Sequence, residues 1–428
     1  MSFLYTIFVG LMIFGMKIFA LFNAKTKKGV EGRKQSLDII KSKFSPDDEV
    51  LWMHAASLGE CEQGLPVLEK LKEKFPDYKI LVTFFSPSGY ENVIKKNTVA
   101  DAICYLPFDR NSDIKEFLKA FKPRLFFTVK YDFWYNLLRQ LKENDAKIFV
   151  VSALFYERQS FFKSYGKWFV KQLKENVDWF FHQTRHSYVL AKSIGLEKSS
   201  VTGDTRFDRV KQIKNKDNHV DFIAEFISGG KTIVFGSSWQ AEEKIARIIS
   251  EKNKNLKLII APHDLKRVQN LKEIFPTAIL YSKLQTSRIQ NSSSNISSIE
   301  LQTPFIQHPS PSILIIDSIG LLSKLYSYAD FAVVGGGFHD SGLHNILEAA
   351  TFGVPVIFGN QYRKNPEADD LIKANGGKSF ETEKEAADFI LKLVKNENLL
   401  SEMSGNASKF VSEKPHSSEL IIQKILSL

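Results

Sequence analysis

Residues 54–60 read His54-Ala-Ala-Ser-Leu-Gly-Glu60 and overlap the end of the apolar run Val50–Ala55. This pattern predicts a strand that turns and enters a helix near Cys61. A second stretch of the same kind, Gly335-Gly-Gly-Phe followed by Gly342-Leu-His-Asn-Ile-Leu-Glu348, lies far along the chain. Such a junction directs backbone N–H groups and a helix dipole at the turn. Two such turns predict two lobes that face one cleft and bind a phosphate-bearing donor.

Outward from these turns, short apolar runs alternate with amphipathic stretches, which predicts an α/β protein with parallel sheets built from βαβ units. The expected strands of the first half are Val50–Ala55, Ile80–Phe85, Leu125–Val129, Ile148–Ala153, Trp179–Gln183 and Ser200–Gly203. Those of the second half are Thr232–Gly236, Leu256–Ala261, Ile313–Ile316, Phe331–Gly335 and Val354–Phe358.

The polar segment Lys211–His219 separates these two series of strands. We therefore expect an acceptor-binding domain over residues 25–212 and a donor-binding domain over residues 213–428. Whether the C-terminal helix returns to the first domain is left open. The Ser- and Asn-rich stretch Gln285–Gln302 is typical of a loop inside the second domain.

The chain has 428 residues, 43% of them apolar, and a formal net charge of +10. Its basic residues are scattered, and neither an aromatic-plus-basic RNA motif nor zinc-finger spacing is found, which disfavours nucleic acid as a partner. Anionic lipids and phosphorylated substrates fit the charge better. The two cysteines, Cys61 and Cys104, form no CxxC pair. No Asp-x-Asp triplet, metal-ligand spacing or GxxxxGK[ST] loop occurs, so no metal and no cofactor is expected.

The first 22 residues are almost wholly apolar from Phe3 to Phe22. About 20 apolar residues match the span of a bilayer core. No basic residue precedes the run and several follow it, which by the positive-inside rule places the remaining chain in the cytoplasm. We expect residues 1–24 to form a single N-terminal transmembrane anchor. The alternative is a buried first helix of the globular domain.

Glu60 opens the predicted helix and admits two interpretations. A carboxylate at a helix N-terminus interacts favourably with the dipole, and Ser57 with Glu60 has capping-box spacing. Alternatively, Glu60 is a general base at the carboxyl end of a parallel strand, where the ligand sites of such sheets lie. Local sequence slightly favours the structural interpretation.

Other small and polar residues at predicted turns are candidates for anion or substrate contacts, and each is equally typical of a turn or helix cap. Asn345 and Glu348 share one helix face, so Glu348 could hold a ribose diol while helix N–H groups bind a phosphate. Adjacent glycines favour this, because they permit close backbone approach. The further candidates are Ser57, Gly59, Ser86, Ser88, Ser237, Ser238, Gly336 and Gly337.

Taken together, the motifs resemble the bacterial 3-deoxy-D-manno-octulosonic acid (Kdo) transferases over nearly the whole chain. The order and spacing of the motifs, rather than any one of them, carry the resemblance. They are Trp52-Met-His-Ala-Ala-Ser-Leu-Gly-Glu60, Thr83-Phe-Phe-Ser-Pro-Ser-Gly-Tyr90, Gly203-Asp-Thr-Arg-Phe-Asp208, Gly236-Ser-Ser-Trp-Gln-Ala-Glu-Glu243, Asp317-Ser-Ile-Gly320 and Gly342-Leu-His-Asn-Ile-Leu-Glu348.

The resemblance implies a GT-B glycosyltransferase with two Rossmann-like domains, which inverts the anomeric centre without a required metal. It implies CMP-Kdo as donor, lipid IVA as acceptor and a place at the cytoplasmic side of the inner membrane among membrane lipids. Glu60 matches the family's catalytic base. The residues that match its CMP contacts are Pro262, His263, Ile319, Gly320, Leu321, Asn345, Ile346, Leu347 and Glu348.

Two departures from the family pattern concern the donor site. Pro262-His263-Asp264 stands where Pro-Arg-His is usual, and Arg267 or Lys266 is a candidate to supply the missing cation. Leu343 replaces the middle glycine of a usual Gly-Gly-His. The alternatives are a GT-B enzyme that uses a UDP-sugar, a nucleotide-sugar epimerase and, outside the enzymes, a membrane-attached anion-binding protein.

Overall fold

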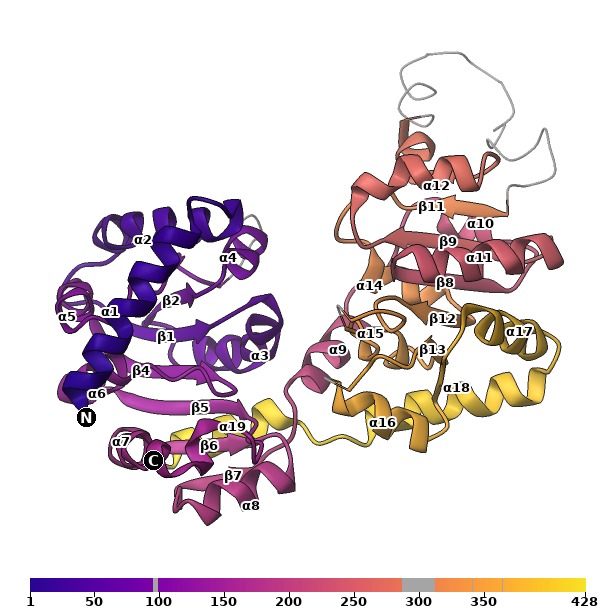
Figure 1. Ribbon diagram of the computed structural model, residues 1–428. Helices are drawn as coiled ribbons and strands as arrows, with labels where there is room; N and C mark the ends of the chain where they lie inside the picture. The colour runs from indigo at the N-terminus through magenta and orange to yellow at the C-terminus, as the bar shows by residue number, and fades with distance from the viewer. Residues whose placement is uncertain (95–98, 287–311, 341, 364) are drawn as a thin grey trace. The chain divides into compact units, whose positions relative to one another are not determined.

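The computed structural model describes residues 1–94, 99–286, 312–340, 342–363 and 365–428, and it forms two compact units (Figure 1). Unit 1 comprises residues 1–209 and 415–428, and unit 2 comprises residues 210–414. Most of the predicted Ser- and Asn-rich loop lies outside the described residues. Each unit is built on a seven-stranded sheet in which all paired strands are parallel. The expected α/β class is confirmed.

Unit 1 has the strand order β3-β2-β1-β4-β5-β6-β7, in which the direction of chain progression reverses between β1 and β4. Ligands of such open sheets bind outside the carboxyl ends of the strands at this reversal. The strands are β1 Glu49–Ala55, β2 Lys79–Phe84, β3 Ala102–Tyr105, β4 Lys122–Val129, β5 Lys147–Ala153, β6 Trp179–His182 and β7 Ser199–Val201.

Helices cover the sheet of unit 1, and the last of them is supplied by the C-terminus (Figure 1). The helices are α1 Ser2–Phe19, α2 Ala24–Lys43, α3 Leu58–Lys74, α4 Pro87–Val93, α5 Asn111–Leu118, α6 Tyr135–Glu143, α7 Lys167–Asn176, α8 Arg185–Ser193 and α19 Ser417–Leu426, with short 3-10 turns η1 Ser160–Phe162 and η2 Ser164–Gly166. Helix α9, Arg206–Lys214, contains the boundary between the units.

Unit 2 has the order β10-β11-β9-β8-β12-β13-β14, with its reversal between β8 and β12. The strands are β8 Thr232–Ser238, β9 Lys257–Pro262, β10 Ile279–Leu280, β11 Ile313–Ile315, β12 Phe331–Val334, β13 Val356–Gly359 and β14 Gly377–Phe380. The helices are α10 Ile223–Ile227, α11 Gln240–Lys252, α12 Val268–Ile274, α14 Leu322–Leu325, α15 Leu347–Ala350, α16 Pro366–Lys373, α17 Glu383–Val394 and α18 Glu397–Ser412, with η3 Leu265–Arg267 and η4 Tyr326–Tyr328.

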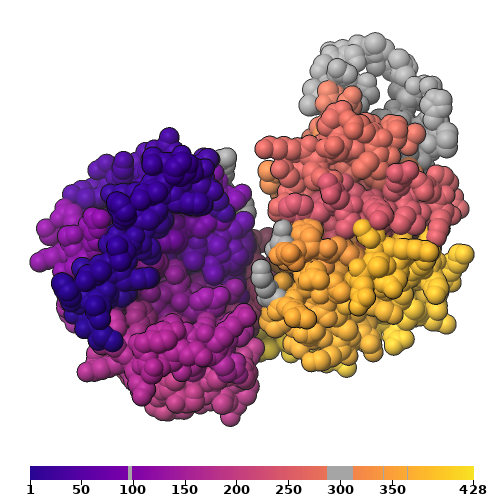
Figure 2. All heavy atoms as spheres, viewed as in Figure 1, coloured from indigo at the N-terminus to yellow at the C-terminus, as the bar shows by residue number. Residues whose placement is uncertain are grey.

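Helix α1 is long and apolar enough to cross a membrane by length and composition, yet one stripe of it packs on unit 1. Val9 and Ile13 are each 1% exposed. One turn earlier, the Tyr5 hydroxyl donates a 2.6 Å hydrogen bond to Asp109, which also accepts from the backbone N–H groups of Asn136 and Leu137 at the start of α6. Figure 2 shows α1, in indigo, lying across the surface of unit 1.

We predict that Tyr5→Phe lowers the free energy of unfolding by about 1.5–3 kcal/mol, because the Asp109 carboxylate loses one of its hydrogen-bond donors in a partly buried site. Urea denaturation in detergent measures the change. Tyr165→Phe is the control, since its side chain is 69% exposed. Equal stability of both variants would show that the hydroxyl of Tyr5 does not hold α1 on the unit.

Candidate functional site

Glu60 lies at the reversal point of the unit 1 sheet, on the first turn of α3 directly after β1. Ser57 occupies the N-cap position, but its hydroxyl donates to Glu60 Oε2 instead of capping a backbone N–H. The expected capping box is therefore replaced by a hydrogen bond between the two side chains. Within the described residues Glu60 Oε1 accepts no hydrogen bond. Gly59 is exposed, and Ser57 and Glu60 are half-buried.

A buried chain of hydrogen bonds leads from the core of unit 1 to the loop after β4, the strand that lies beside β1 at this reversal point. Trp52 Nε1 donates to Thr83 Oγ1 at 2.8 Å, and Thr83 Oγ1 lies 2.9 Å from His54 Nδ1. His54 Nε2 lies 2.7 Å from Asp132 Oδ2. Nδ1 also lies 3.1 Å from the Thr83 backbone oxygen, so both ring nitrogens of His54 have hydrogen-bond partners inside the protein. The chain orients Asp132 in the loop that follows β4.

The loop after β4 also lies close enough to Glu60 for the charge of Glu60 to shift the pKa of Tyr131. Partial burial, and after it the negative charge of Glu60, raise the pKa of Tyr131. Lys130, the residue before Tyr131, has a left-handed backbone with φ of 65°. A non-glycine residue in that region costs backbone strain, so the surrounding hydrogen bonds must hold the loop. Glu60, Tyr131 and Asp132 thus gather where the sheet order reverses.

Ser86 and Ser88 lie at the start of α4, after the neighbouring strand β2. Ser86 is the N-cap residue, and its Oγ accepts a 3.3 Å hydrogen bond from the Ser88 N–H. The two hydroxyl oxygens are 2.8 Å apart. Their local role is therefore that of a helix cap, which is one of the two interpretations that the sequence leaves open.

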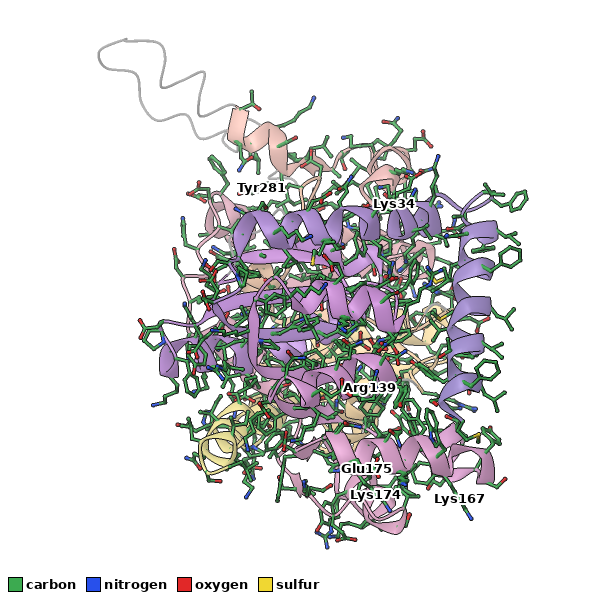
Figure 3. The ribbon with its side chains drawn as sticks, turned by 90° about the vertical axis from the view of Figure 1, so that its left-hand side faces the viewer. Lys34, Arg139, Lys167, Lys174, Glu175 and Tyr281 are labelled. Carbon is green, nitrogen blue, oxygen red and sulfur yellow. The ribbon has the colours of Figure 1, made fainter. Side chains whose placement is uncertain are left out.

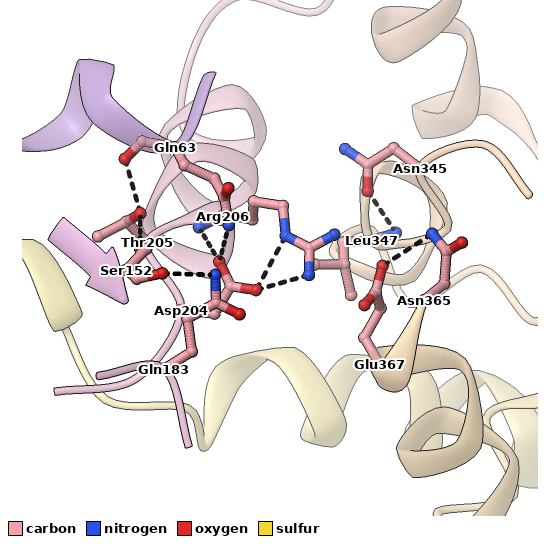
Figure 4. A network of polar contacts seen from close by, with 10 residues as sticks. All are labelled: Gln63, Ser152, Gln183, Asp204, Thr205, Arg206, Asn345, Leu347, Asn365 and Glu367. Carbon is pink, nitrogen blue, oxygen red and sulfur yellow. Dashed lines mark hydrogen bonds and ion pairs between the residues drawn. The ribbon is translucent and has the colours of Figure 1, made fainter. Parts of the chain in front are cut away.

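The motif Gly203–Asp208 connects distant parts of unit 1 (Figure 4). Asp204 accepts a 3.0 Å hydrogen bond from Gln63 on α3 and forms an ion pair with Arg206 at 2.6 Å. Thr205 Oγ1 donates to the Gln63 backbone oxygen at 2.6 Å. Asp208 accepts a 2.9 Å hydrogen bond from Ser418 at the start of α19. The motif thereby fixes the helix that carries Glu60.

Unit 2 has a second polar cluster at its own reversal point. Glu242, buried on α11, accepts from the N–H of Trp239 at 2.9 Å and from the N–H of Gly336 at 3.2 Å. It therefore joins the segments after β8 and β12. The Trp239 ring stacks on His263 with centroids 4.5 Å apart, and His263 contacts His344 at 4.7 Å. Burial, followed by His263 and His339, lowers the pKa of His344 to about 4.

Several predicted anion contacts in unit 2 are buried or already hydrogen-bonded, while Ser237 is half-buried. Strand β8 continues through Ser238, and Trp239 takes the N-cap position of α11, so neither Ser237 nor Ser238 caps the helix. Ser238 is fully buried. The N–H of Gly336 is already donated to Glu242, and Gly337 is buried.

The glycines of this region are explained by close approach to the chain's own backbone. A Cβ at Gly335 would lie 2.0 Å from the Ser237 oxygen, and one at Gly337 would lie 2.6 Å from the Gly359 nitrogen. Gly336 also has a φ of 91°. The close approach of the backbone at the carboxyl ends of β8, β12 and β13 therefore requires these glycines. This packing accounts for them without a ligand.

The other candidates for donor contacts differ in how exposed their side chains are. Asn345 Oδ1 accepts from the Leu347 N–H at 3.1 Å and its amide donates to Glu348 at 3.2 Å, next to the buried Ile346 and Leu347. Ile319 is 86% exposed beside the exposed Gly320, whose φ is 97°. The half-buried positions are Pro262, Leu321, Asn345 and Glu348.

Two cations are candidates to replace the arginine that is usual in the family, and one of them, Arg267, already forms an ion pair. Arg267 donates to both carboxylate oxygens of Glu243, with Nε 2.7 Å from Oε1. Glu243 is 1% exposed, so this is a buried ion pair that is costly to break. Lys266 is exposed and has no ion pair within the described residues.

Sequence reasoning missed the residues that support the site from other segments, namely Asp132, Tyr131, Gln63, Trp239 and Glu242. Asp132 lies three residues after the predicted strand Leu125–Val129, and a position just beyond a strand end is a signal for a site in a parallel sheet. Its pairing with His54 spans 78 positions and has no local pattern.

We predict that Asp204→Asn lowers the free energy of unfolding at neutral pH by about 1–3 kcal/mol, because the ion pair between Asp204 and Arg206 is lost. Burial alone would raise the pKa of Asp204, but Arg206 and Gln63 lower it overall. This carboxylate therefore contributes stability above its unfolded pKa of about 3.9 and loses that contribution as pH falls toward the folded pKa. Denaturation curves should show the gap from the parent narrowing below about pH 4. A gap independent of pH would contradict this role.

Comparisons with known proteins agree with the motifs. The model of the family described as 3-deoxy-D-manno-octulosonic-acid transferase (kdotransferase) matches residues 31–209. A bifunctional glycosyltransferase/methyltransferase of Fusobacterium nucleatum is 30% identical over 332 residues, which cover 74% of this chain and 48% of that protein. The chain thus spans about half the length of this relative. A 3-deoxy-D-manno-octulosonic acid transferase of Chlamydophila psittaci is 28% identical over 339 residues, which cover 77% of this chain and 73% of that protein.

Among solved structures, a UDP-GlcNAc 2-epimerase from Neisseria meningitidis bound to UDP-GlcNAc has a TM-score of 0.59 to this chain. The match covers 89% of this chain and 100% of the other, at 15% sequence identity. At that identity the likeness shows the fold alone. Residues 31–209 match the family model, and the curated relatives extend the similarity over about three quarters of the chain, so this chain is similar to the Kdo transferases and has the two parallel Rossmann-like units of a GT-B fold.

Proposed function

We propose that this protein transfers Kdo from CMP-Kdo to lipid IVA, with inversion at the anomeric centre. The observation that carries the proposal is Glu60, which lies at the reversal point of the sheet that the family match covers and whose Oε1 accepts no hydrogen bond from the described residues. A base at this point needs an accessible oxygen and a fixed orientation. The Ser57 hydroxyl supplies the orientation by donating to the other carboxylate oxygen.

In the proposed reaction Glu60 removes the proton from a hydroxyl of the acceptor. The acceptor oxygen then forms a bond to the anomeric carbon of Kdo, while the bond from that carbon to the CMP phosphate oxygen breaks. The bonding electrons leave with CMP, and its phosphate oxygen takes the negative charge. Attack and departure occur on opposite sides of the anomeric carbon, so its configuration inverts.

For the donor we propose the exposed and half-buried residues of unit 2 that match the CMP contacts of the family. Glu348 and Asn345 would hold the ribose, and Pro262, His263 and the segment Ile319–Leu321 would surround the nucleotide. His263 is exposed yet held by its stack on Trp239, which gives a flat surface suited to a pyrimidine ring. Lys266 is the cation that remains for the donor phosphate, because Arg267 is paired with Glu243.

We further propose that α1 attaches the protein to the cytoplasmic side of the inner membrane. Its outward face carries large apolar side chains, among them Phe3 at 73% and Phe14 at 63% exposure. Such a face is costly in water and favourable among acyl chains. A lipid acceptor would meet the enzyme at that surface.

The first test is Glu60→Gln, which keeps the size of the side chain but removes the base. We predict a loss of transfer rate of roughly 10²–10⁴-fold, with CMP binding unchanged. The assay follows Kdo-lipid formation from CMP-Kdo and lipid IVA. Glu73→Gln, the same change at an exposed position of α3, is the control and should retain full activity. Near-normal turnover of Glu60→Gln would reduce Glu60 to a helix-end carboxylate.

A second test concerns the donor. If Glu348 holds the ribose diol, Glu348→Ala should weaken CMP binding by about 1.5–3 kcal/mol, the usual contribution of hydrogen bonds to a charged group. Calorimetric titration with CMP measures this, beside a melting curve. Glu381→Ala, at an exposed position of the same unit, is the control. Lowered stability with unchanged CMP affinity would leave Glu348 as a structural partner of Asn345 only.

A further inference from the structure

A cavity of about 560 Å³ lies in unit 1 between α1, α2 and the start of α5, apart from Glu60. Four cationic side chains line it, contributed by three segments: Lys17 from α1, Arg33 and Lys34 from α2, and Arg110 at the N-cap position of α5. The remaining wall is largely apolar, with Ile13, Val30, Leu37, Pro107, Phe108 and Phe117. The cavity is therefore amphipathic and lies against the apolar helix α1.

Most of these cations lack a counter-charge in the protein. Lys17, Lys34 and Arg110 are exposed and form no ion pair within the described residues. Two acids, Asp113 and Glu116, also line the cavity. Glu116 is paired with both Lys41 and Lys119, so its charge is already balanced outside the cavity. The lining therefore carries an excess of positive charge, which an anion could neutralise.

Arg33 forms the buried end of the cavity and is rigidly held. Its side chain is 7% exposed, and its two terminal nitrogens donate to the backbone oxygens of Gly29 and Phe85 at 2.7 Å. The guanidinium also lies over the rings of Phe85 and Phe108. Its Nε has no hydrogen-bond partner within the described residues. A buried donor without a partner is costly, so the guanidinium keeps part of its hydrogen-bonding capacity unused next to the cavity.

The apolar part of the surroundings continues along the outer face of α1. Phe3, Ile7, Leu11, Phe14 and Ile18 recur at helical spacing and are 44–73% exposed. Figure 3 shows Lys34 on α2, near the end of α1, and side chains projecting outward along α1. A ligand in the cavity would thus have cations around its head and an apolar surface beside its tail.

We propose that this cavity binds the phosphate headgroup of an anionic glycerophospholipid of the bilayer. Lys17, Lys34 and Arg110 would contact the phosphate, and the acyl chains would run along α1. Charge complementarity and continuity with the exposed face of α1 select a lipid over a free phosphate. Because α1 stays docked on unit 1 through Tyr5, Val9 and Ile13, it would lie along the membrane surface in this complex.

The test uses the purified full chain and vesicles of phosphatidylcholine, with or without an equal part of phosphatidylglycerol. Each basic side chain near an anionic surface contributes about a fivefold factor in binding. We therefore expect Lys34→Gln with Arg110→Gln to lower the partition coefficient on phosphatidylglycerol vesicles by about 25-fold. Binding to pure phosphatidylcholine should change little.

The matched control removes the same charge from two exposed positions of unit 2 that form no ion pair with any described residue, as Lys216→Gln with Lys395→Gln. We expect it to lower the partition coefficient by less than about threefold. An equal loss in both double variants, or no loss in either, would overturn the proposal, because net charge or α1 alone would then explain binding.

A second measurement follows thermal stability instead of vesicle binding. Short-chain phosphatidylglycerol below its micelle concentration should raise the melting temperature of the parent protein, and inorganic phosphate at the same concentration should not. The rise should disappear in the Lys34→Gln, Arg110→Gln variant. An equal rise with inorganic phosphate would make this a free-phosphate site, and no rise with the lipid would show that the cavity does not hold it. Neither result bears on Kdo transfer.

Discussion

The hydrogen-bond chain from Trp52 through Thr83 and His54 to Asp132 is the interaction on which the arrangement of unit 1 depends. It crosses the buried interior of the sheet from β2 through β1 to the loop after β4. Because its first three members are fully buried, each must find its partner inside the protein. The chain therefore holds the loop with Tyr131 and Asp132 next to the helix that carries Glu60, where the order of strands reverses.

A second constraint fixes that helix one turn further along. Gln63, one turn after Glu60, bonds Asp204, while Asp208 of the same motif holds the C-terminal helix α19 through Ser418. A sequence segment that contacts no candidate reacting group thus still determines where Glu60 lies. In unit 2 the buried Glu242 plays the corresponding part, because it joins the segments after β8 and β12 at their reversal point.

Much of the fold could be predicted from the sequence, because fully buried parallel strands are continuous apolar runs such as Ile148–Ala153. The missed strands β3, β10 and β14 are short, and Gly377–Phe380 has no apolar run to reveal it. Helix α1 shows a different limit: its composition indicates a membrane helix, but its docking by Tyr5 depends on Asp109, 104 positions away. Long-range pairs of this kind have no local signature. In the sequence, the glycines 335–337 favoured a ligand site. In the structure, the backbone atoms that lie against them come from other segments of the chain.

Kdo transfer itself is tested most directly by mass spectrometry of the lipid product. The purified protein is incubated with CMP-Kdo and lipid IVA, and the mass of the lipid and the amount of free CMP are measured together. We expect the lipid to gain the mass of one or more Kdo residues, with one CMP released for each. Unchanged lipid in the presence of folded, CMP-binding protein would contradict the assignment of Kdo transfer to lipid IVA.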